Sequence, residues 1–170
     1  LRDLPGAQAL LDLLYEEAFT EQCGRQAALD RLCELLLIRL LRHCLDRGLT
    51  KGGTLAGLAD PRLAKALVAV HEDAMRAWEL SDMAQLAGMS RARFAVHFRE
   101  VIGDTPADYL ATWRVTLAQG LLRAGRPLKH VALDVGYGSA SAFTRAFIRK
   151  TGKAPTHWLR DADAEAAAQA

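Results

Sequence analysis

The sequence predicts an all-α protein, in which two helix-turn-helix subdomains are joined by a long connecting helix and preceded by a helical linker or dimerisation segment. Three observations support this fold class. Apolar residues recur with the three-to-four-residue period of helices and almost never alternate as they do in strands. Aromatic residues make up only 6% of the chain, whereas alanine and leucine are abundant, which favours helix over sheet. A pattern of two short helices also occurs twice, about 48 residues apart.

Two helices and a linker are predicted in a first segment, residues 1–57. A short helix over 6–20 would be followed by a long one from about Gln26 to Arg47, ended by Gly48. The apolar stripe of the long helix is too wide to face a single partner. The glycine-rich stretch 51–57 would be the linker. The short helix would turn inward Leu10, Leu11, Leu14 and Phe19.

Three helices follow in a second segment, residues 58–160, and each is marked by a residue that favours a helix start. Asp60 would cap a helix that has Pro61 at its first position and runs to about residue 73. Ser81 or Asp82 would cap a short helix through residue 87, and Ser90 would cap another to about residue 101.

The long connecting helix is predicted next, from Thr105–Pro106 to about residue 124, where Gly125 ends it. Pro127 would open a short helix to about residue 136, and Ser139 would cap one to about residue 151. Pro155 would begin a last turn through residue 160, and residues 161–170 would form a flexible tail.

The internal repeat has the features of a helix-turn-helix: small residues where the two helices approach, a glycine at the turn, and a serine cap on the second helix. The connecting helix of about 19 residues would span roughly 28 Å, and successive major grooves on one face of DNA lie about 34 Å apart. The matched residues are Leu80, Met83, Ala84, Ala87 and Gly88 with Leu128, Val131, Ala132, Val135 and Gly136, and Ser90, Phe94, Phe98, Gly103 and Pro106 with Ser139, Phe143, Phe147, Gly152 and Pro155.

Charge is segregated along the chain although the net charge is only +2. Residues 61–160 contain 15 Lys and Arg against 8 Asp and Glu, a net charge of +7, whereas residues 1–60 carry a net charge of −2. A basic domain of this size indicates a polyanionic partner, of which nucleic acid is the first candidate.

Two stretches carry a resemblance to a known family. Residues 136–155 and 86–98, followed by Gly103 and Thr105–Pro106, resemble the AraC/XylS family of transcription regulators. The resemblance covers 61–160, and residues 1–50 more loosely resemble the helices that follow a cupin-type effector domain. It implies a bacterial, cytoplasmic regulator of double-stranded DNA, with RNA polymerase as partner if it is an activator. It further implies that a small-molecule effector binds a β-barrel N-terminal to this chain, which itself contains no such barrel.

Candidate DNA contacts follow from helix phase and from the family motif. The first predicted recognition helix has small apolar residues on its groove face, which can touch thymine methyls but cannot form bidentate hydrogen bonds. Arg145 in the second is the best candidate to recognise a base directly. The groove-facing candidates are Arg91, Ala92, Ala95, Val96, Ala140, Ser141, Thr144 and Arg145; the phosphate candidates are Ser90, Arg93, Arg99, Arg114, Ser139, Arg149, Lys150 and Lys153.

Other functions find less support. The main alternative is a helical protein–protein interaction module, or a homodimer, that uses the apolar helix 26–47. No nucleophile–base arrangement, phosphate-binding glycine loop or carboxylate pair is present, so neither an enzyme nor a cofactor is expected. The histidines have no metal-ligand spacing, and no stretch is apolar for the length of a membrane helix. The three cysteines are odd in number and form no CxxC pair, which is typical of a reducing cytosol.

Overall fold

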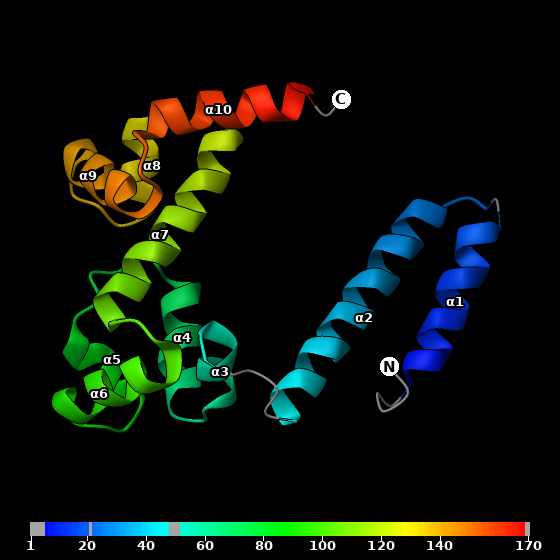
Figure 1. The fold of residues 1–170 in the computed structure, drawn as a ribbon, viewed down its shortest axis with the longest axis horizontal. Helices are drawn as coiled ribbons and strands as arrows, with labels where there is room; N and C mark the ends of the chain where they lie inside the picture. The colour runs from blue at the N-terminus through cyan, green and yellow to red at the C-terminus, as the bar shows by residue number, and fades with distance from the viewer. Residues whose placement is uncertain (1–5, 21, 48–51, 169–170) are drawn as a thin grey trace. The chain divides into compact units, whose positions relative to one another are not determined.

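The computed structural model describes residues 6–20, 22–47 and 52–168, and all regular secondary structure in these ranges is helical (Figure 1). The predicted all-α class is therefore confirmed. The chain divides into two compact units, Leu1–Lys51 and Gly52–Ala170. The predicted boundary at residue 57 lies within the second unit.

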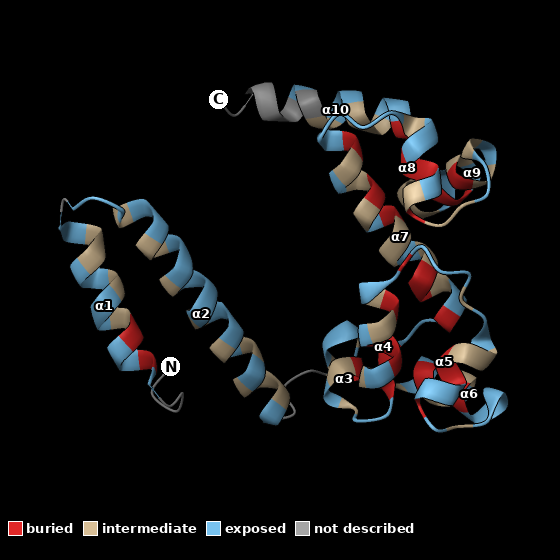
Figure 2. Ribbon diagram, turned by 180° about the vertical axis from the view of Figure 1, so that it is seen from behind, coloured by how far each residue is buried: buried red, intermediate tan, exposed pale blue. Residues whose placement is uncertain are grey.

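The first unit is a pair of helices, α1 (Ala7–Phe19) and α2 (Arg25–Asp46), that pack side by side (Figure 1). Both agree with the predicted helices to within about a residue, and Gly24 at φ 84° forms the turn into α2. The predicted stop at Gly48 lies outside the described residues. Few side chains are buried: only Ala7 and Leu10 in α1 and none in α2 (Figure 2).

One sequence prediction for this unit is wrong. Phe19 was expected to face inward but is 80% exposed, because α1 ends there and the residue stacks only on Tyr15. On α2, Cys33 is exposed and Cys44 is half-buried. A two-helix pair covers only one face of each helix, so a wide apolar stripe leaves part of itself in solvent.

The second unit begins with α3 (Thr54–Ala59), which packs on α4 (Leu63–Glu72) and on α6 (Arg91–Ile102). The predicted linker 51–57 is therefore partly helix. Gly57 in this helix is buried, and a Cβ there would lie 2.7 Å from Leu67 Cδ1 and 2.8 Å from Ile102 Cδ1. This glycine allows close packing and does not mark a loop.

Helix starts follow the predicted caps at most positions. The Asp60 carboxylate accepts hydrogen bonds from the N–H groups of Arg62 and Leu63, at 2.9 and 3.0 Å, although the helix proper begins two residues after Pro61. The cap of α5 (Leu80–Leu86) is Glu79, whose N–H donates to Asp82 at 3.1 Å. The expected caps Ser81 and Asp82 instead lie inside that helix.

The remaining helices are α7 (Pro106–Arg123), α8 (Leu128–Asp134), α9 (Ala140–Thr151) and α10 (Pro155–Ala168). The first three match the predicted connecting helix and second repeat. The prediction for the last is too short: α10 continues through residues 161–168, where a single turn followed by a flexible tail was expected.

Two separate cores lie in the second unit, and α7 contributes to both. Its first half supplies Tyr109 and Leu110 to one core, and its second half supplies Val115, Ala118 and Leu122 to the other. Each core centres on one phenylalanine pair of the repeat, and all four rings are at most 1% exposed: Phe94, Phe98, Phe143 and Phe147. The two rings of each pair are spaced i, i+4 and lie in the same core.

Candidate nucleic-acid interface

The two halves of the second unit form the same turn between their two helices. In the first, the N–H of Met89 donates to the carbonyl of Ala84 at 2.9 Å; in the second, the N–H of Tyr137 donates to the carbonyl of Ala132 at 2.9 Å. Each carbonyl belongs to a buried alanine. Each turn also has a glycine in the left-handed region, Gly88 at φ 64° and Gly136 at φ 81°.

A serine starts the second helix of each pair. Ser90 Oγ accepts a hydrogen bond from the N–H of Arg93 at 3.4 Å, and Ser139 Oγ accepts one from the N–H of Ala142 at 3.2 Å. These bonds fix where α6 and α9 begin, and therefore which residues of each helix face outward. The predicted caps are confirmed at both positions.

The outward face of α6 carries most of the residues predicted from phase. With Phe94 and Phe98 buried, Arg91, Ala92, Arg93 and Arg99 are exposed, and Val96 is 59% exposed. Ala95 differs, because it is half-buried and lines a cleft beside α7 that is described below. The open surface of α6 therefore combines small apolar side chains with arginines.

The outward face of α9 is more polar. Ser141 and Arg145 are exposed, and Ala140 and Thr144 are half-buried beside them. Within the described part of the chain, the Arg145 side chain has no ion pair or hydrogen bond. Its guanidinium is therefore available to an external acceptor.

The predicted phosphate contacts fall into two groups. The side chains of Arg93, Arg99 and Arg149 are exposed and form no ion pair or hydrogen bond with any residue that the structure describes. Lys153 pairs with Asp161 at 2.7 Å, and both side chains are at least 50% exposed. Lys150 is only 20% exposed and lies 3.4 Å from Asp108. The Asp108 pKa is held below its ordinary value first by the Thr105 hydroxyl and then by Lys150.

Arg114 is not placed as a phosphate contact. Its guanidinium is half-buried and donates to the carbonyls of Ala74 and Arg76, both at 2.8 Å. Burial lowers the pKa of Arg114, and the nearby Tyr137 partly opposes this. The correction has a simple cause: Arg114 lies directly before the buried Val115 on α7, and its side chain reaches the carbonyls of Ala74 and Arg76.

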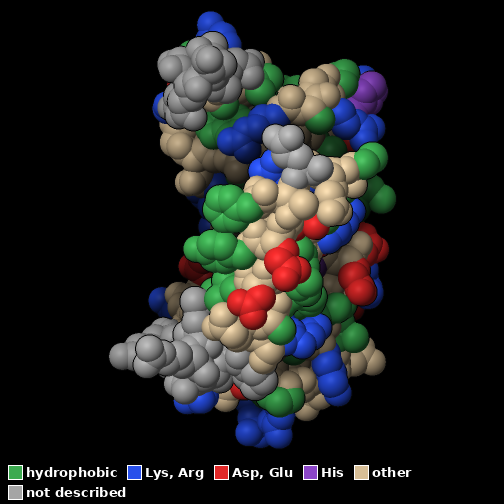
Figure 3. Space-filling model, turned by 90° about the vertical axis from the view of Figure 1, so that its right-hand side faces the viewer, with side chains coloured by type: hydrophobic (Ala, Val, Ile, Leu, Met, Phe, Trp, Pro, Cys, Tyr) green, Lys and Arg blue, Asp and Glu red, His purple; other side chains and the backbone are tan. Residues whose placement is uncertain are grey.

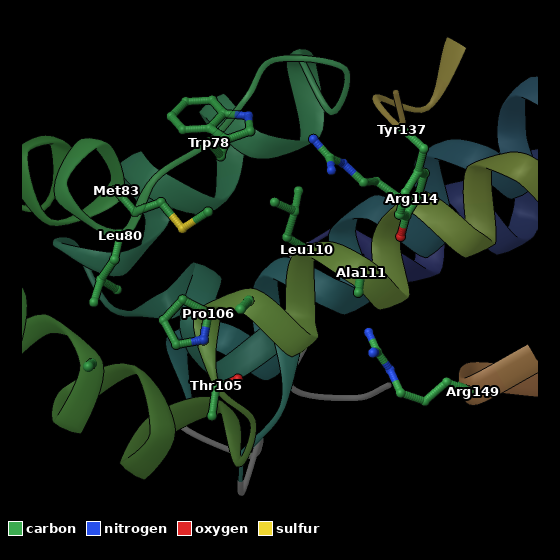
Figure 4. A pocket seen from close by; sticks show the side chains of 12 residues that line it. Trp78, Leu80, Met83, Thr105, Pro106, Leu110, Ala111, Arg114, Tyr137 and Arg149 are labelled. Atoms are coloured by element: carbon green, nitrogen blue, oxygen red, sulfur yellow. The ribbon is translucent and has the colours of Figure 1, made fainter. Parts of the chain in front are cut away.

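A cleft of about 420 Å³ lies between the two helix-turn-helix units, with α7 along it (Figure 4). Its walls are largely apolar and include Trp78, Leu80 and Leu110. The cationic groups that line it are Arg114 and Arg149, and no carboxylate lines it. Because the Arg114 guanidinium is bound to two backbone carbonyls, the positive charge that these lining residues leave open comes from Arg149.

One polar link near the interface had no sequence signal. His97 Nε2 on α6 lies 2.7 Å from Asp60 Oδ2, which ties α6 to the start of α4. Burial raises the pKa of Asp60, but the bonds from Leu63, His97 and Arg62 outweigh it and hold the pKa below its ordinary value. The two residues are 37 positions apart, so no local pattern connects them.

Other kinds of site are not found. Among the described residues, no three His, Cys, Asp or Glu side chains come together as metal ligands. Within those residues there is also no helix with the length and apolar character needed to cross a membrane.

Comparison with known proteins gives two family matches. Residues 83–161 match a family described as a helix-turn-helix domain, and residues 2–46 match one described as a cupin. Among curated relatives, a putative AraC-like transcription regulator of Streptomyces lividans is 41% identical over 74% of this chain and 42% of its own length. Another, from Streptomyces antibioticus, is 36% identical over 89% of this chain and 52% of its own. The chain thus spans about half the length of the curated relatives it matches.

Solved structures agree on the second unit. The DNA-binding domain of AdpA, a global transcriptional factor crystallised with a target DNA, is 30% identical and matches with a TM-score of 0.58. The match covers 62% of this chain and 96% of that domain. An AraC-type DNA-binding regulator from Chromobacterium violaceum shares the fold at a TM-score of 0.56 and 20% identity.

Proposed function

Since the chain belongs to the AraC family of helix-turn-helix transcription regulators, we propose that it recognises specific double-stranded DNA sequences by placing α6 and α9 in successive major grooves. The observation that carries the proposal is the duplicated unit: two identical turns, two serine-capped helices and an outward face on each. The 18 residues of α7 correspond to roughly 27 Å of helix, near the spacing of successive grooves.

The two recognition helices would have different tasks. On α9, Arg145 would direct its planar fork to O6 and N7 of a guanine, with Ser141 and Thr144 as adaptable neighbours. On α6, Ala92 and Val96 would make apolar contacts to thymine methyls, while Arg91 supplies the polar contact. Most of the sequence discrimination would therefore come from the α9 half of the site.

Phosphate contacts would position both helices. Arg93, Arg99 and Arg149 support this role by their exposure, and the N-terminal N–H groups beside Ser90 and Ser139 can bind a phosphate as well. Lys153 can exchange Asp161 for a phosphate at little cost, because exposed ion pairs contribute about 0–1 kcal/mol. Lys150 would contribute charge from the side of the interface.

Replacing Arg145 tests the assignment of the base-contacting face. Arg145→Ala is expected to lose about 1–3 kcal/mol of base discrimination in one half of the site, because a bidentate guanine contact is removed. The measurement is selection from randomised duplexes with the wild type and the variant at one fixed salt concentration.

Two variants serve as controls for that selection. Lys153→Ala removes a phosphate contact and should weaken all sequences about equally. Val96→Ser alters an apolar contact and should change preference modestly, and only in the other half-site. If Arg145→Ala keeps the wild-type base preference in both halves and lowers affinity uniformly, Arg145 contacts the backbone and the assigned face is wrong.

The wider regulatory role is also a proposal. We infer that the protein acts in the cytoplasm, contacts RNA polymerase if it is an activator, and responds to a small molecule held by a cupin-type domain outside this chain. The cupin match over residues 2–46 and the greater length of the relatives support the last point. No catalytic role is proposed, because the matched relatives are named as regulators.

The α2 surface favours a second role in self-association. Leu35, Leu37, Ile38 and Leu40 are between 39% and 57% exposed, and Figure 3 shows hydrophobic side chains at the surface of the α1–α2 side. An apolar surface of this kind marks an interaction site. We propose that α2 forms a homodimer contact, which covers these side chains.

A charged substitution on α2 tests this contact. Leu37→Asp is expected to weaken dimerisation by about tenfold or more, since a buried unpaired carboxylate costs more than about 1–3 kcal/mol. Sedimentation equilibrium would measure the change, with Ala27→Asp as the control, because it adds the same charge at an exposed position of the same helix. A wild-type chain that stays monomeric at its highest soluble concentration contradicts the dimer.

A further inference from the structure

Arg114 contacts both helix-turn-helix units from the middle of α7. Its Nε donates to the carbonyl of Ala74 and its Nη2 to the carbonyl of Arg76, both at 2.8 Å. Both carbonyls lie in the segment that leads into the first helix-turn-helix, α5–α6. The guanidinium carbon also lies 5.5 Å from the ring centroid of Tyr137, in the turn of the second helix-turn-helix, α8–α9 (Figure 4). One side chain therefore spans the junction.

The backbone of the second helix-turn-helix also comes close to the segment before α5 at this place. A Cβ on Gly136 would lie 2.7 Å from Met75 O and 2.7 Å from Arg114 Nη2, so only glycine fits. The equivalent glycine of the first helix-turn-helix, Gly88, has open space around its Cβ position. The turn geometry accounts for both glycines, but the close contact is particular to Gly136 and belongs to the junction between the units.

A second link ties α9 to the start of α7. Lys150 Nζ, near the end of the recognition helix, lies 3.4 Å from Asp108 Oδ1. Asp108 is itself held in the first turn of α7, where its carboxylate accepts from the Thr105 hydroxyl at 2.8 Å and its N–H donates to Thr105 Oγ1 at 3.1 Å. Because α7 follows α6 after a short turn, this ion pair connects the two recognition helices.

We propose that Arg114, together with Tyr137 and the Asp108–Lys150 pair, locks the two helix-turn-helix motifs, α5–α6 and α8–α9, at one separation and one rotation, so that the spacing between half-sites becomes a determinant of specificity. This inference rests on the proposed function. One inserted base pair displaces a half-site by about 3.4 Å and rotates it by about 35°. A rigid junction cannot follow that change, and one recognition helix then loses its groove.

Arginine is suited to this position for a chemical reason. Its planar fork donates to two carbonyls while its face remains free to lie over an aromatic ring, which lysine cannot do. The contact also stays charged at any physiological pH, because arginine does not deprotonate in proteins.

The test compares half-site spacing in selected DNA. The full-length chain is used to select from randomised duplexes, and binding is then measured on the selected site and on the same site with one base pair inserted between its halves. The wild type is expected to lose about tenfold or more on insertion, as for a lost half-site contact. Arg114→Gln and Lys150→Gln are each expected to lose about threefold or less.

Two controls isolate the junction. Arg123→Gln removes the same charge from the same helix. Arg123, however, lies over Trp158, which packs on the core of the second helix-turn-helix, at 4.7 Å from the ring centroid. Tyr137→Phe keeps the ring under the guanidinium. Both controls should keep the wild-type penalty for insertion.

The outcomes separate the two proposals. If the wild type enriches no paired half-sites, the proposed function fails. If it does, and the Arg114 and Lys150 variants keep the full insertion penalty, the spacing inference is overturned. If circular dichroism shows that Arg114→Gln is unfolded, Lys150→Gln and Tyr137→Leu decide the question by the same measurement.

Discussion

Between about 50 and 200 mM salt, the affinity of the chain for duplex DNA is expected to fall roughly 10²- to 10³-fold, because each of about four to six neutralised phosphates contributes about −0.9 to the log–log slope. The net charge of +7 over residues 61–160 motivates this expectation. So do the exposed guanidinium groups of Arg93, Arg99 and Arg149, which no described residue pairs. Fluorescence anisotropy with a labelled duplex of selected sequence, over a salt series, measures the slope.

Matched variants show which unit carries the effect. Arg93→Gln should reduce the magnitude of the slope by about one, since one phosphate contact is removed. Arg31→Gln also removes an exposed arginine, but from α2, where it pairs with Glu34 at 2.8 Å. It should leave the slope unchanged. Affinity that stays flat across the salt series would remove the electrostatic basis of the proposal.

Phe143→Ala is expected to destabilise the second helix-turn-helix by about 3–5 kcal/mol, because a large buried ring leaves a cavity. Phe143 is 0% exposed, and its ring centroid lies 5.5 Å from that of Phe147 and 5.6 Å from that of Tyr137. Its core is separate from the one around Phe94, so α5 and α6 should stay folded while α8 and α9 lose structure.

Hydrogen exchange resolves this difference between the two helix-turn-helix motifs. In Phe143→Ala, amides of α8 and α9 should exchange faster while those of α5 and α6 keep most of their protection. Phe94→Ala is the mirror-image control, and it should give the reverse pattern because the two phenylalanines are equivalent in the repeat. Equal loss of protection in all four helices would show one cooperative core and contradict the division.

The repeat could be predicted from sequence because its determinants are local. A phenylalanine pair at i and i+4, a serine at the cap and a glycine at the turn each act within a few residues, and the structure confirms all three. The residues predicted to face a groove follow from the same phase, and five of the eight are exposed. Ala95, Ala140 and Thr144 are half-buried instead. Ala95 lines the cleft beside α7, a contact that the phase of one helix does not contain.

Features that depend on distant packing were missed. Gly57 was interpreted as part of a linker because a glycine-rich stretch looks like one locally, whereas its burial against Leu67 and Ile102 is tertiary. Arg114 was interpreted as a surface cation. A signal was available: it lies four residues after the buried Leu110 and directly before the buried Val115, so a charge on that side of the helix needs internal partners.

Phe19 shows the opposite limit. Its apolar character and helical phase indicated an inward position, but α1 packs only on α2 in the described residues and leaves it in solvent. The periodicity of a helix indicates which face is apolar, and the partner that covers this face is a separate property. The exposed side chains of α2 follow the same logic, which is why we assign them to an intermolecular contact.

Methylation protection of guanine N7 tests the central claim, that α6 and α9 occupy two successive major grooves, most directly. Dimethyl sulfate modifies N7 from the major groove, where Arg145 is proposed to bind. On a selected duplex, the wild-type chain should protect guanines in two clusters about one helical turn apart, and Arg145→Ala should expose the guanine in one of them. A single protected cluster, or protection that is unchanged by Arg145→Ala, would contradict the account.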